Sequence, residues 1–264
     1  MTNEKTNKPP VEWAELLKEA VNKPGTISKA YSHFWRYSPG NQLLALWECH
    51  KRGIEAGPIA TFKGWQGLNR WVRKGQKAIT LCMPVVFKKK VEKEEGTEEE
   101  VSFRKFIYRP NWFVLSQTDG EAFEPEPIPG WDEATALATL GIEKKPFDML
   151  DGNVQGYARD KTVTVSPIAF APEKTLFHEV AHVVLGHTLE GLMSDSEKTP
   201  RSLQEAEAES VALIVLESLG LPGAEHCRGY IQHWYRAGEI PEKSAQKIFK
   251  AADAILKAGR PQSA

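Results

Sequence analysis

Residues 175–185 read Thr-Leu-Phe-His-Glu-Val-Ala-His-Val-Val-Leu, an apolar run interrupted by two histidines and one glutamate. The run is preceded by Pro172, which suits the first turn of a helix, and by Glu173, whose negative charge favours a helix N-terminus. Almost all other positions are apolar or small, as in a helix that is buried rather than solvated. The stretch therefore predicts a buried helix that carries ionisable side chains.

The two histidines of this helix have the spacing of metal ligands. His178 and His182 are four residues apart, so they lie on the same face and can bind one zinc ion together. Glu179 is placed to reach a water on that ion, which is the pattern of a zinc hydrolase. The alternative is a core helix whose histidines are satisfied by hydrogen bonds alone.

A second helix, predicted over residues 202–219, offers a third ligand. Its apolar residues recur at helical spacing, at positions 208, 211, 212, 215, 216 and 219. Glu205 and Glu209 fall on the edge of this stripe, whereas Glu207 points away from it. Glu205 is the predicted third zinc ligand, and Glu209 is predicted to accept a hydrogen bond from the free ring nitrogen of a ligating histidine. Alternatively, all three glutamates form a solvated face at the start of the helix.

His187 follows His182 by five residues and Gly186 by one. A site with three histidines of the metzincin kind needs the third histidine six residues on and a glycine where Leu185 stands. His187 is therefore predicted to lie at the C-terminus of the helix, where its charge or hydrogen bonding suits the exposed carbonyls.

The two helices together resemble a known peptidase domain. His-Glu-x-x-His at 178–182, followed by Glu205, Ala208, Glu209 and Ala212, is similar to the gluzincin-type metallopeptidase domain at the C-terminus of ArdC-type antirestriction proteins and to the related ImmA/IrrE peptidases. The likeness covers about residues 130–257. It implies a mostly helical zincin-like domain with a small sheet, Zn²⁺ as cofactor, and a protein partner as substrate.

Charge divides the chain into two parts. Lysine and arginine number 20 against 12 aspartates and glutamates in residues 1–117, and 14 against 23 in residues 118–264. Residues 118–130, which are rich in proline, glycine and acids, are the predicted linker. Domains are thus expected over residues 1–117 and 131–264. Six acids between Glu92 and Glu100 are predicted to form a solvated hairpin tip, so the rest of the first domain is basic.

The first domain is predicted to be α+β, with helices packed on an antiparallel sheet. Helices are expected over residues 11–21, 28–37, 41–51 and 63–73, and strands over 59–62, 78–89, 101–108 and 111–115. In the second domain a hairpin is expected over residues 154–165, and helices over 223–257. The hairpin is either the edge that binds an extended peptide or a sheet that packs under the helices without a ligand role.

Aromatic and basic residues are interleaved in the first domain. Bases stack on aromatic faces while lysine and arginine neutralise phosphates, so the mixture favours single-stranded nucleic acid, although such residues also occur as ordinary core and rim residues. The stretches 36–44, 61–65 and 72–77 are similar to the N-terminal single-stranded-DNA-binding domain of ArdC-type proteins over about residues 10–117. The predicted nucleic-acid-binding residues are Arg36, Tyr37, Asn41, Lys63, Trp65, Arg70, Trp71, Arg73, Lys74 and Lys77.

Composition favours a cytoplasmic protein without a membrane contact. No run of about 18 apolar residues is present, the N-terminus lacks the apolar centre of a signal peptide, and the three cysteines form no closely spaced pair. The resemblance implies a protein of a plasmid or other mobile element that protects incoming DNA from restriction.

Two functions of different classes remain open at this point. One is a DNA-binding zinc peptidase in which Glu179 takes a proton from the attacking water. The other is a DNA-binding protective protein whose zinc domain is structural or binds a partner without turnover, since a metal site stabilises a fold whether or not it catalyses. The presence of Glu179 favours the enzyme, because a structural site needs only the ligands.

Overall fold

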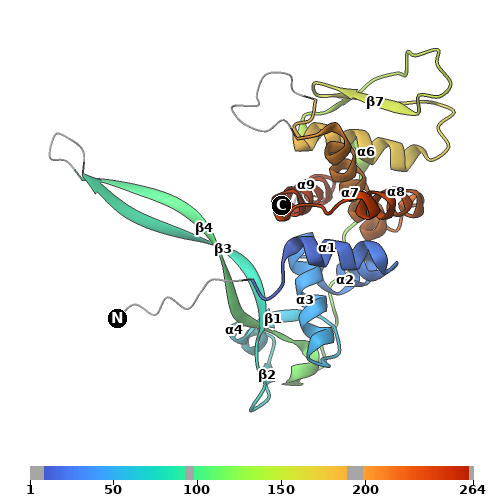
Figure 1. Cartoon of the computed structure of the whole chain (residues 1–264). Coiled ribbons are helices and arrows are strands. Elements are labelled where there is room, and N and C mark those ends of the chain that lie inside the picture. The colour runs from blue at the N-terminus through green and yellow to red at the C-terminus, as the bar shows by residue number, and fades with distance from the viewer. Residues whose placement is uncertain (1–8, 93–97, 189–198, 262–264) are drawn as a thin grey trace. The chain divides into compact units, whose positions relative to one another are not determined.

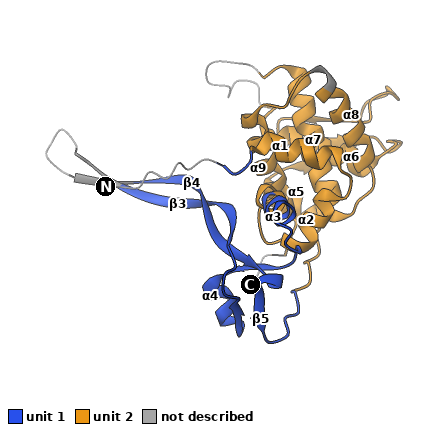
Figure 2. Cartoon of the chain, turned by 60° about the horizontal axis from the view of Figure 1, so that its bottom comes forward, with its two compact units in different colours: residues 1–11, 44–125 blue, residues 12–43, 126–264 orange. Residues whose placement is uncertain are grey.

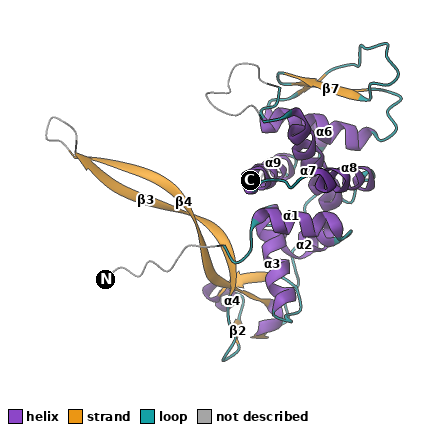
Figure 3. Cartoon of the chain, viewed as in Figure 1, coloured by secondary structure: helices purple, strands orange, loops and turns teal. Residues whose placement is uncertain are grey.

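The computed structural model describes residues 9–92, 98–188 and 199–261. Within these ranges helices predominate and are accompanied by three small sheets (Figure 3), so the predicted α+β class is confirmed. Among the described residues, no helix is long and apolar enough to cross a membrane.

The chain forms two compact units (Figure 2). Unit 1 comprises residues 1–11 and 44–125, and unit 2 comprises residues 12–43 and 126–264. This grouping differs from the predicted domains, because α1 (Trp13–Asn22) and α2 (Thr26–Phe34) belong to unit 2, together with the first turn of α3 (Pro39–Lys51). It also places residues 118–125 of the predicted linker in unit 1.

Unit 1 is built around a three-stranded antiparallel sheet in the order β1-β4-β3. Its strands are β1 (Ile59–Thr61), β3 (Ile79–Glu92) and β4 (Glu98–Val114), and β3 and β4 form the long hairpin seen in Figure 1. The two strands predicted at 101–108 and 111–115 are one continuous strand. The short α4 (Phe62–Gly67) contacts both β1 and β4, whereas α1 and α2 belong to unit 2.

The helix predicted over residues 63–73 is only half correct. α4 ends at Gly67, Asn69 has a positive φ of 53°, and the chain continues as β2 (Arg70–Val72). A left-handed residue cannot continue a helix, so the chain turns here. β2 pairs with β5 (Thr118–Gly120), which follows the single 3-10 turn η1 (Leu115–Gln117), and the start of the predicted linker is therefore a strand.

Trp65 is part of the core of unit 1. It is 1% exposed, its Nε1 donates a hydrogen bond to the carbonyl of Phe113 (2.8 Å), and its ring meets that of Phe123 edge-on at 5.3 Å. A ring enclosed in this way cannot stack on a base. The prediction that Trp65 contacts nucleic acid is therefore wrong.

Unit 2 is organised around α7 (Arg201–Leu219). This helix packs against α2, α6 (Pro172–Leu185), α8 (Ala224–Ala237) and α9 (Glu242–Ala258). Every residue from Ala206 to Leu216 is buried, so the helix has no solvated face along this stretch. The predicted apolar stripe is therefore only one side of a helix that is buried on all sides from Ala206 to Leu216.

The N-terminal helices complete this bundle. α1 contacts α8 and α9, and α2 contacts α7. Arg228 of α8 donates a hydrogen bond to the carbonyl of Ala20 (2.8 Å) near the end of α1 and pairs with Glu217 of α7. Helical periodicity identifies the buried face of a helix but not the element that covers it, which is why this packing was not predicted.

The sheet of unit 2 packs against α6. β8 (Thr162–Val165) is central, parallel to β6 (Glu143–Lys144) and antiparallel to β7 (Gly156–Arg159), which is a sheet edge. β6 follows the short α5 (Glu133–Leu140), which packs on α9. Both β7 and β8 contact α6. A side chain at Gly156 would come within 2.6 Å of Thr175 Cγ2, so glycine permits the close approach of strand and helix.

Candidate metal centre

The ends of α6 fix the positions of its histidines. Pro172 occupies the first turn, Glu173 is the acid of that turn, and Gly186 ends the helix with a φ of +78°. Glycine adopts this left-handed conformation without strain and commonly ends helices in this way. The buried apolar residues of the helix are Leu176, Phe177, Val180 and Ala181.

Three donor atoms converge beside α6. The Nε2 atoms of His178 and His182 are 3.1 Å apart, and Oε2 of Glu205 is 3.2 Å from the first and 3.5 Å from the second. All three residues are partly buried, and they form the cluster of potential metal ligands identified among the described residues. The structure thus brings together the three predicted ligands from two helices.

This donor set fits a divalent metal ion. Ligands bound tetrahedrally at the zinc distance of about 2.0–2.1 Å lie about 3.3–3.4 Å from one another, close to the sides of the observed triangle. Two imidazole nitrogens and a carboxylate oxygen are also the donor types of catalytic zinc sites. Burial opposes the charged form of His178, yet the Glu205 and Glu209 carboxylates raise its pKa to about 9. The carboxylates therefore stabilise a positive charge at this position.

Glu209 lies behind His178. Its Oε1 is 3.3 Å from the Nδ1 of His178, on the side of the ring away from the donor triangle, and it also accepts a hydrogen bond from Lys174. Burial opposes ionisation, but His178 and Lys174 hold the pKa of Glu209 below its usual range. Lys174 was not predicted, although it precedes His178 by one helical turn.

Glu207 points away from the donor triangle, as helical phase predicts, but it faces protein rather than solvent. It is 1% exposed, and its Oε2 is 3.0 Å from the Nε2 of His187. The Nδ1 of His187 is in turn 3.0 Å from the Nδ1 of His182. The backbone N–H of His187 does donate to a carbonyl at the end of the helix, that of His182 (2.9 Å). The predicted role for the His187 side chain is wrong, because the buried stretch of α7 supplies Glu207 as its partner.

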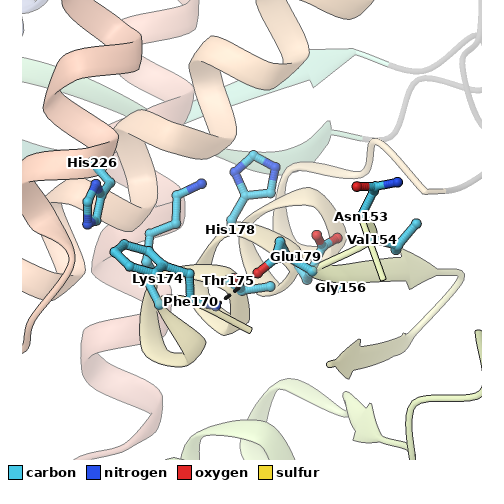
Figure 4. Close-up of a pocket in the computed structure, with 11 residues that line it drawn as sticks. Asn153, Val154, Gly156, Phe170, Lys174, Thr175, His178, Glu179 and His226 are labelled. Carbon is cyan, nitrogen blue, oxygen red and sulfur yellow. Dashed lines mark hydrogen bonds between the residues drawn. The ribbon is translucent and has the colours of Figure 1, made fainter. Parts of the chain in front are cut away.

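Glu179 lies where two cavities meet. The smaller, of about 450 Å³, is drawn in Figure 4, and the larger is about 940 Å³. Both are lined by His178, Glu179 and Gly156. Glu179 is 9% exposed, and burial raises the pKa of its carboxyl group against the opposing effect of His178 and His182. A carboxylate with a raised pKa is a stronger proton acceptor.

Two residues near the cluster gave no sequence signal. The hydroxyl of Tyr230 in α8 has its pKa raised by burial and by the carboxylates of Glu205 and Glu209. The thiol of Cys227 is buried, and its pKa is raised by that burial and by Glu209. Tyr157 lines the larger cavity and donates a hydrogen bond to Asp148, whereas His233 of α8 is exposed and lines neither cavity.

The candidate nucleic-acid residues of unit 1 lie on α4, β2 and the turn that follows. Trp71 is 55% exposed, whereas Arg70 is half-buried and donates from Nε to Thr118 Oγ1 (2.9 Å), which anchors β5. Phe62, which was not predicted, is 47% exposed. The exposed basic residues of this region are Lys63, Arg73, Lys74 and Lys77.

The remaining three candidates belong to unit 2. Arg36 is exposed and forms an ion pair with Glu126, and Tyr37 and Asn41 are partly buried. The predicted nucleic-acid residues are therefore divided between the two units.

Comparison with known proteins relates the N-terminal part of the chain to one family. Residues 10–110 match the family described as the N-terminal domain of anti-restriction factor ArdC. The uncharacterized protein y4eC of Sinorhizobium fredii (strain NBRC 101917 / NGR234) is 25% identical over 259 residues, which cover 88% of this chain and 78% of that protein. The N-terminal match supports a relationship to the ArdC antirestriction family.

One solved structure extends the likeness of fold over most of the chain. The metal-free crystal structure of the antirestriction ArdC protein from the R388 plasmid is 20% identical, covers 94% of both chains and gives a TM-score of 0.51. The Mn(II)-bound structure of that protein is 19% identical, covers 94% of this chain and 97% of that one, and gives a TM-score of 0.49. The metal-free structure shows that the fold is shared.

Proposed function

We propose that the chain is a single-stranded-DNA-binding protein of the antirestriction type that carries a metal-dependent peptidase centre. The observation that carries the peptidase half is the triangle of donor atoms from His178, His182 and Glu205, with a buried Glu179 beside it. The similarity of residues 10–110 to the ArdC N-terminal domain supports the DNA-binding half.

His178, His182 and Glu205 would hold the metal, and we propose Zn²⁺ because two imidazoles and one carboxylate suit it. When bound, the ion supplies Lewis acidity to a peptide carbonyl. Glu179 accepts the proton of the attacking water on its carboxylate and returns it to the leaving amine. The burial that raises the pKa of Glu179 strengthens it as this base.

The edge strand β7 is the proposed peptide-binding element. It lines the larger cavity through residues 156–159, and no strand among the described residues pairs with its outer edge. An extended peptide can add to such an edge through backbone hydrogen bonds, which would place a peptide bond near Glu179.

A metal-loading experiment with a proteolysis screen tests the peptidase half. The full-length chain is freed of metal, loaded with zinc or with manganese, and incubated with a panel of proteins. Metal-dependent cleavage, strongest with zinc, is the expected result. Tight metal binding without cleavage of any protein would instead favour a DNA-binding protein whose metal domain stabilises the fold or binds a partner.

Trp71→Ala is expected to weaken binding of single-stranded DNA by about 1–3 kcal/mol, because an exposed ring can stack on a base. Binding of a labelled oligonucleotide to the full-length chain at several salt concentrations measures this loss. Affinity should fall steeply with salt in both proteins, since the lysines and arginines release counterions from the phosphates.

Trp65→Ala provides the contrast. Truncating this buried ring should cost about 3–5 kcal/mol of folding stability, measured by denaturant unfolding, rather than act on binding alone. Wild-type affinity and wild-type salt dependence in a well-folded Trp71→Ala chain would exclude Trp71 from the binding surface.

A further inference from the structure

The imidazole of His187 is largely buried, and the proposed metal site does not use it as a ligand. Its side chain lies between His182 and Glu207, with 3.0 Å from Nδ1 to Nδ1 on one side and 3.0 Å from Nε2 to the Glu207 Oε2 on the other. The His187 side chain is 7% exposed, and that of Glu207 is 1% exposed. These contacts form a continuous chain of hydrogen-bonding groups that ends on a proposed metal ligand.

The direction of these hydrogen bonds follows from the chemistry of the groups. An ionised carboxylate only accepts, so the Nε2 of His187 carries a proton and donates it to Glu207. In a neutral His187 the Nδ1 is then an acceptor, and the Nδ1 of His182 must carry the proton between the two rings. The Nε2 of His182 is left with its lone pair directed at His178 and Glu205.

We infer that His187 and Glu207 position His182 as a metal ligand by fixing its ring orientation and its tautomer. His187 is thus a positioning residue, and the metal-binding atom of His182 is Nε2. This inference rests on the proposed metal site, and it adds the two residues that hold the ligand His182 in place.

The two ligand histidines are supported in different ways by the same helix. Glu209 reaches the Nδ1 of His178 directly, at 3.3 Å. Glu207 lies on the opposite side of α7 and reaches the Nδ1 of His182 only through the imidazole of His187. The three alternate glutamates of α7 therefore serve one site, Glu205 as ligand and the other two behind the histidines.

The backbone after α6 holds His187 in this place. Gly186 turns the chain in the left-handed conformation, and the N–H of His187 bonds the carbonyl of His182 (2.9 Å). The hydroxyl of Thr188 donates to the carbonyl of Asp160 (2.7 Å), which ties this turn to the β7–β8 hairpin. The imidazole is therefore held from the backbone as well as by its two ring contacts.

His187→Phe tests the inference in the full-length chain, because it keeps a ring but removes both hydrogen bonds. We expect zinc affinity, measured by competition with a chromophoric chelator, to fall about 10- to 100-fold, as is typical when a partner of a metal ligand is lost. His187→Gln, whose amide can both accept and donate, should recover most of the affinity. His233→Phe, at an exposed histidine that lines neither cavity, is the matched control and should leave the affinity unchanged.

Nitrogen NMR of the histidine rings gives a second readout that does not depend on any variant. In the zinc-loaded wild-type protein, His182 should carry its proton on Nδ1 and be metal-bound through Nε2, and His187 should carry its proton on Nε2. Unfolding of the metal-free variants in the presence of a chelator measures separately any loss of stability.

Three results would overturn the inference, and they are distinguishable. A well-folded His187→Phe chain with wild-type zinc affinity would show that His182 needs no support from His187. Metal bound to a ring nitrogen of His187 itself would make it a ligand instead. A wild-type chain that binds no metal would overturn the proposed metal site as well.

Discussion

His178→Ala or His182→Ala is expected to leave the purified protein without bound metal, whereas the wild-type chain is expected to hold about one zinc ion. Each substitution removes one corner of a donor triangle whose sides are 3.1–3.5 Å. Two remaining ligands rarely hold zinc against water, and structural and catalytic sites use at least three protein ligands. Metal content after dialysis, measured by mass spectrometry, provides the test.

Glu205→Gln completes this series. It should weaken zinc binding more than Glu207→Gln does, because the Glu205 carboxylate is a proposed ligand of the metal, whereas Glu207 acts on the site only through His187. Glu133→Gln, at an exposed carboxylate of α5, is the control for a general loss of charge and should bind zinc normally. Unchanged metal content in both histidine variants would contradict the site, and the reverse order of the glutamate variants would contradict the roles given to α7.

Glu179→Gln is expected to keep the metal and the fold and to lose peptide hydrolysis. The amide has almost the same size as the carboxyl group but cannot accept the proton of the attacking water, so the rate should fall by at least about 10²-fold to 10⁴-fold. Cleavage of the substrate found by the proteolysis screen, at equal zinc content, measures the loss. Undiminished cleavage would show that Glu179 is not the base.

The same variant separates the two halves of the proposed function. None of the predicted nucleic-acid residues lines the cavities beside Glu179, so binding of single-stranded DNA should keep its wild-type salt dependence. A DNA-transfer assay in a restricting host then asks whether protection needs the peptidase. If Glu179→Gln still protects, binding alone accounts for protection, and the role without turnover replaces the enzymatic one.

Local spacing was enough to predict the centre of the site. His178 and His182 are one helical turn apart on a helix with a clear start and end, and Glu205 follows from the phase of the next helix. These positions depend on residues close in sequence, and helical geometry relates such residues directly.

Features that depend on packing partners could not be predicted in this way. The phase of α7 shows that Glu207 points away from the donor triangle, but not that this side of the helix is buried against His187. The apolar face of α1 is visible in the sequence, whereas its packing on α8 and α9 is not. Trp65 and Trp71 both lie close to a basic residue in the sequence, yet Trp65 is buried in the core and Trp71 is exposed.

X-ray diffraction from crystals of the zinc-loaded full-length protein, collected at the zinc absorption edge, would locate the bound metal. We predict one anomalous peak within bonding distance of the Nε2 atoms of His178 and His182 and of a carboxylate oxygen of Glu205. A peak at other residues, or none beside α6 in crystals shown to contain zinc, would contradict the proposed metal site.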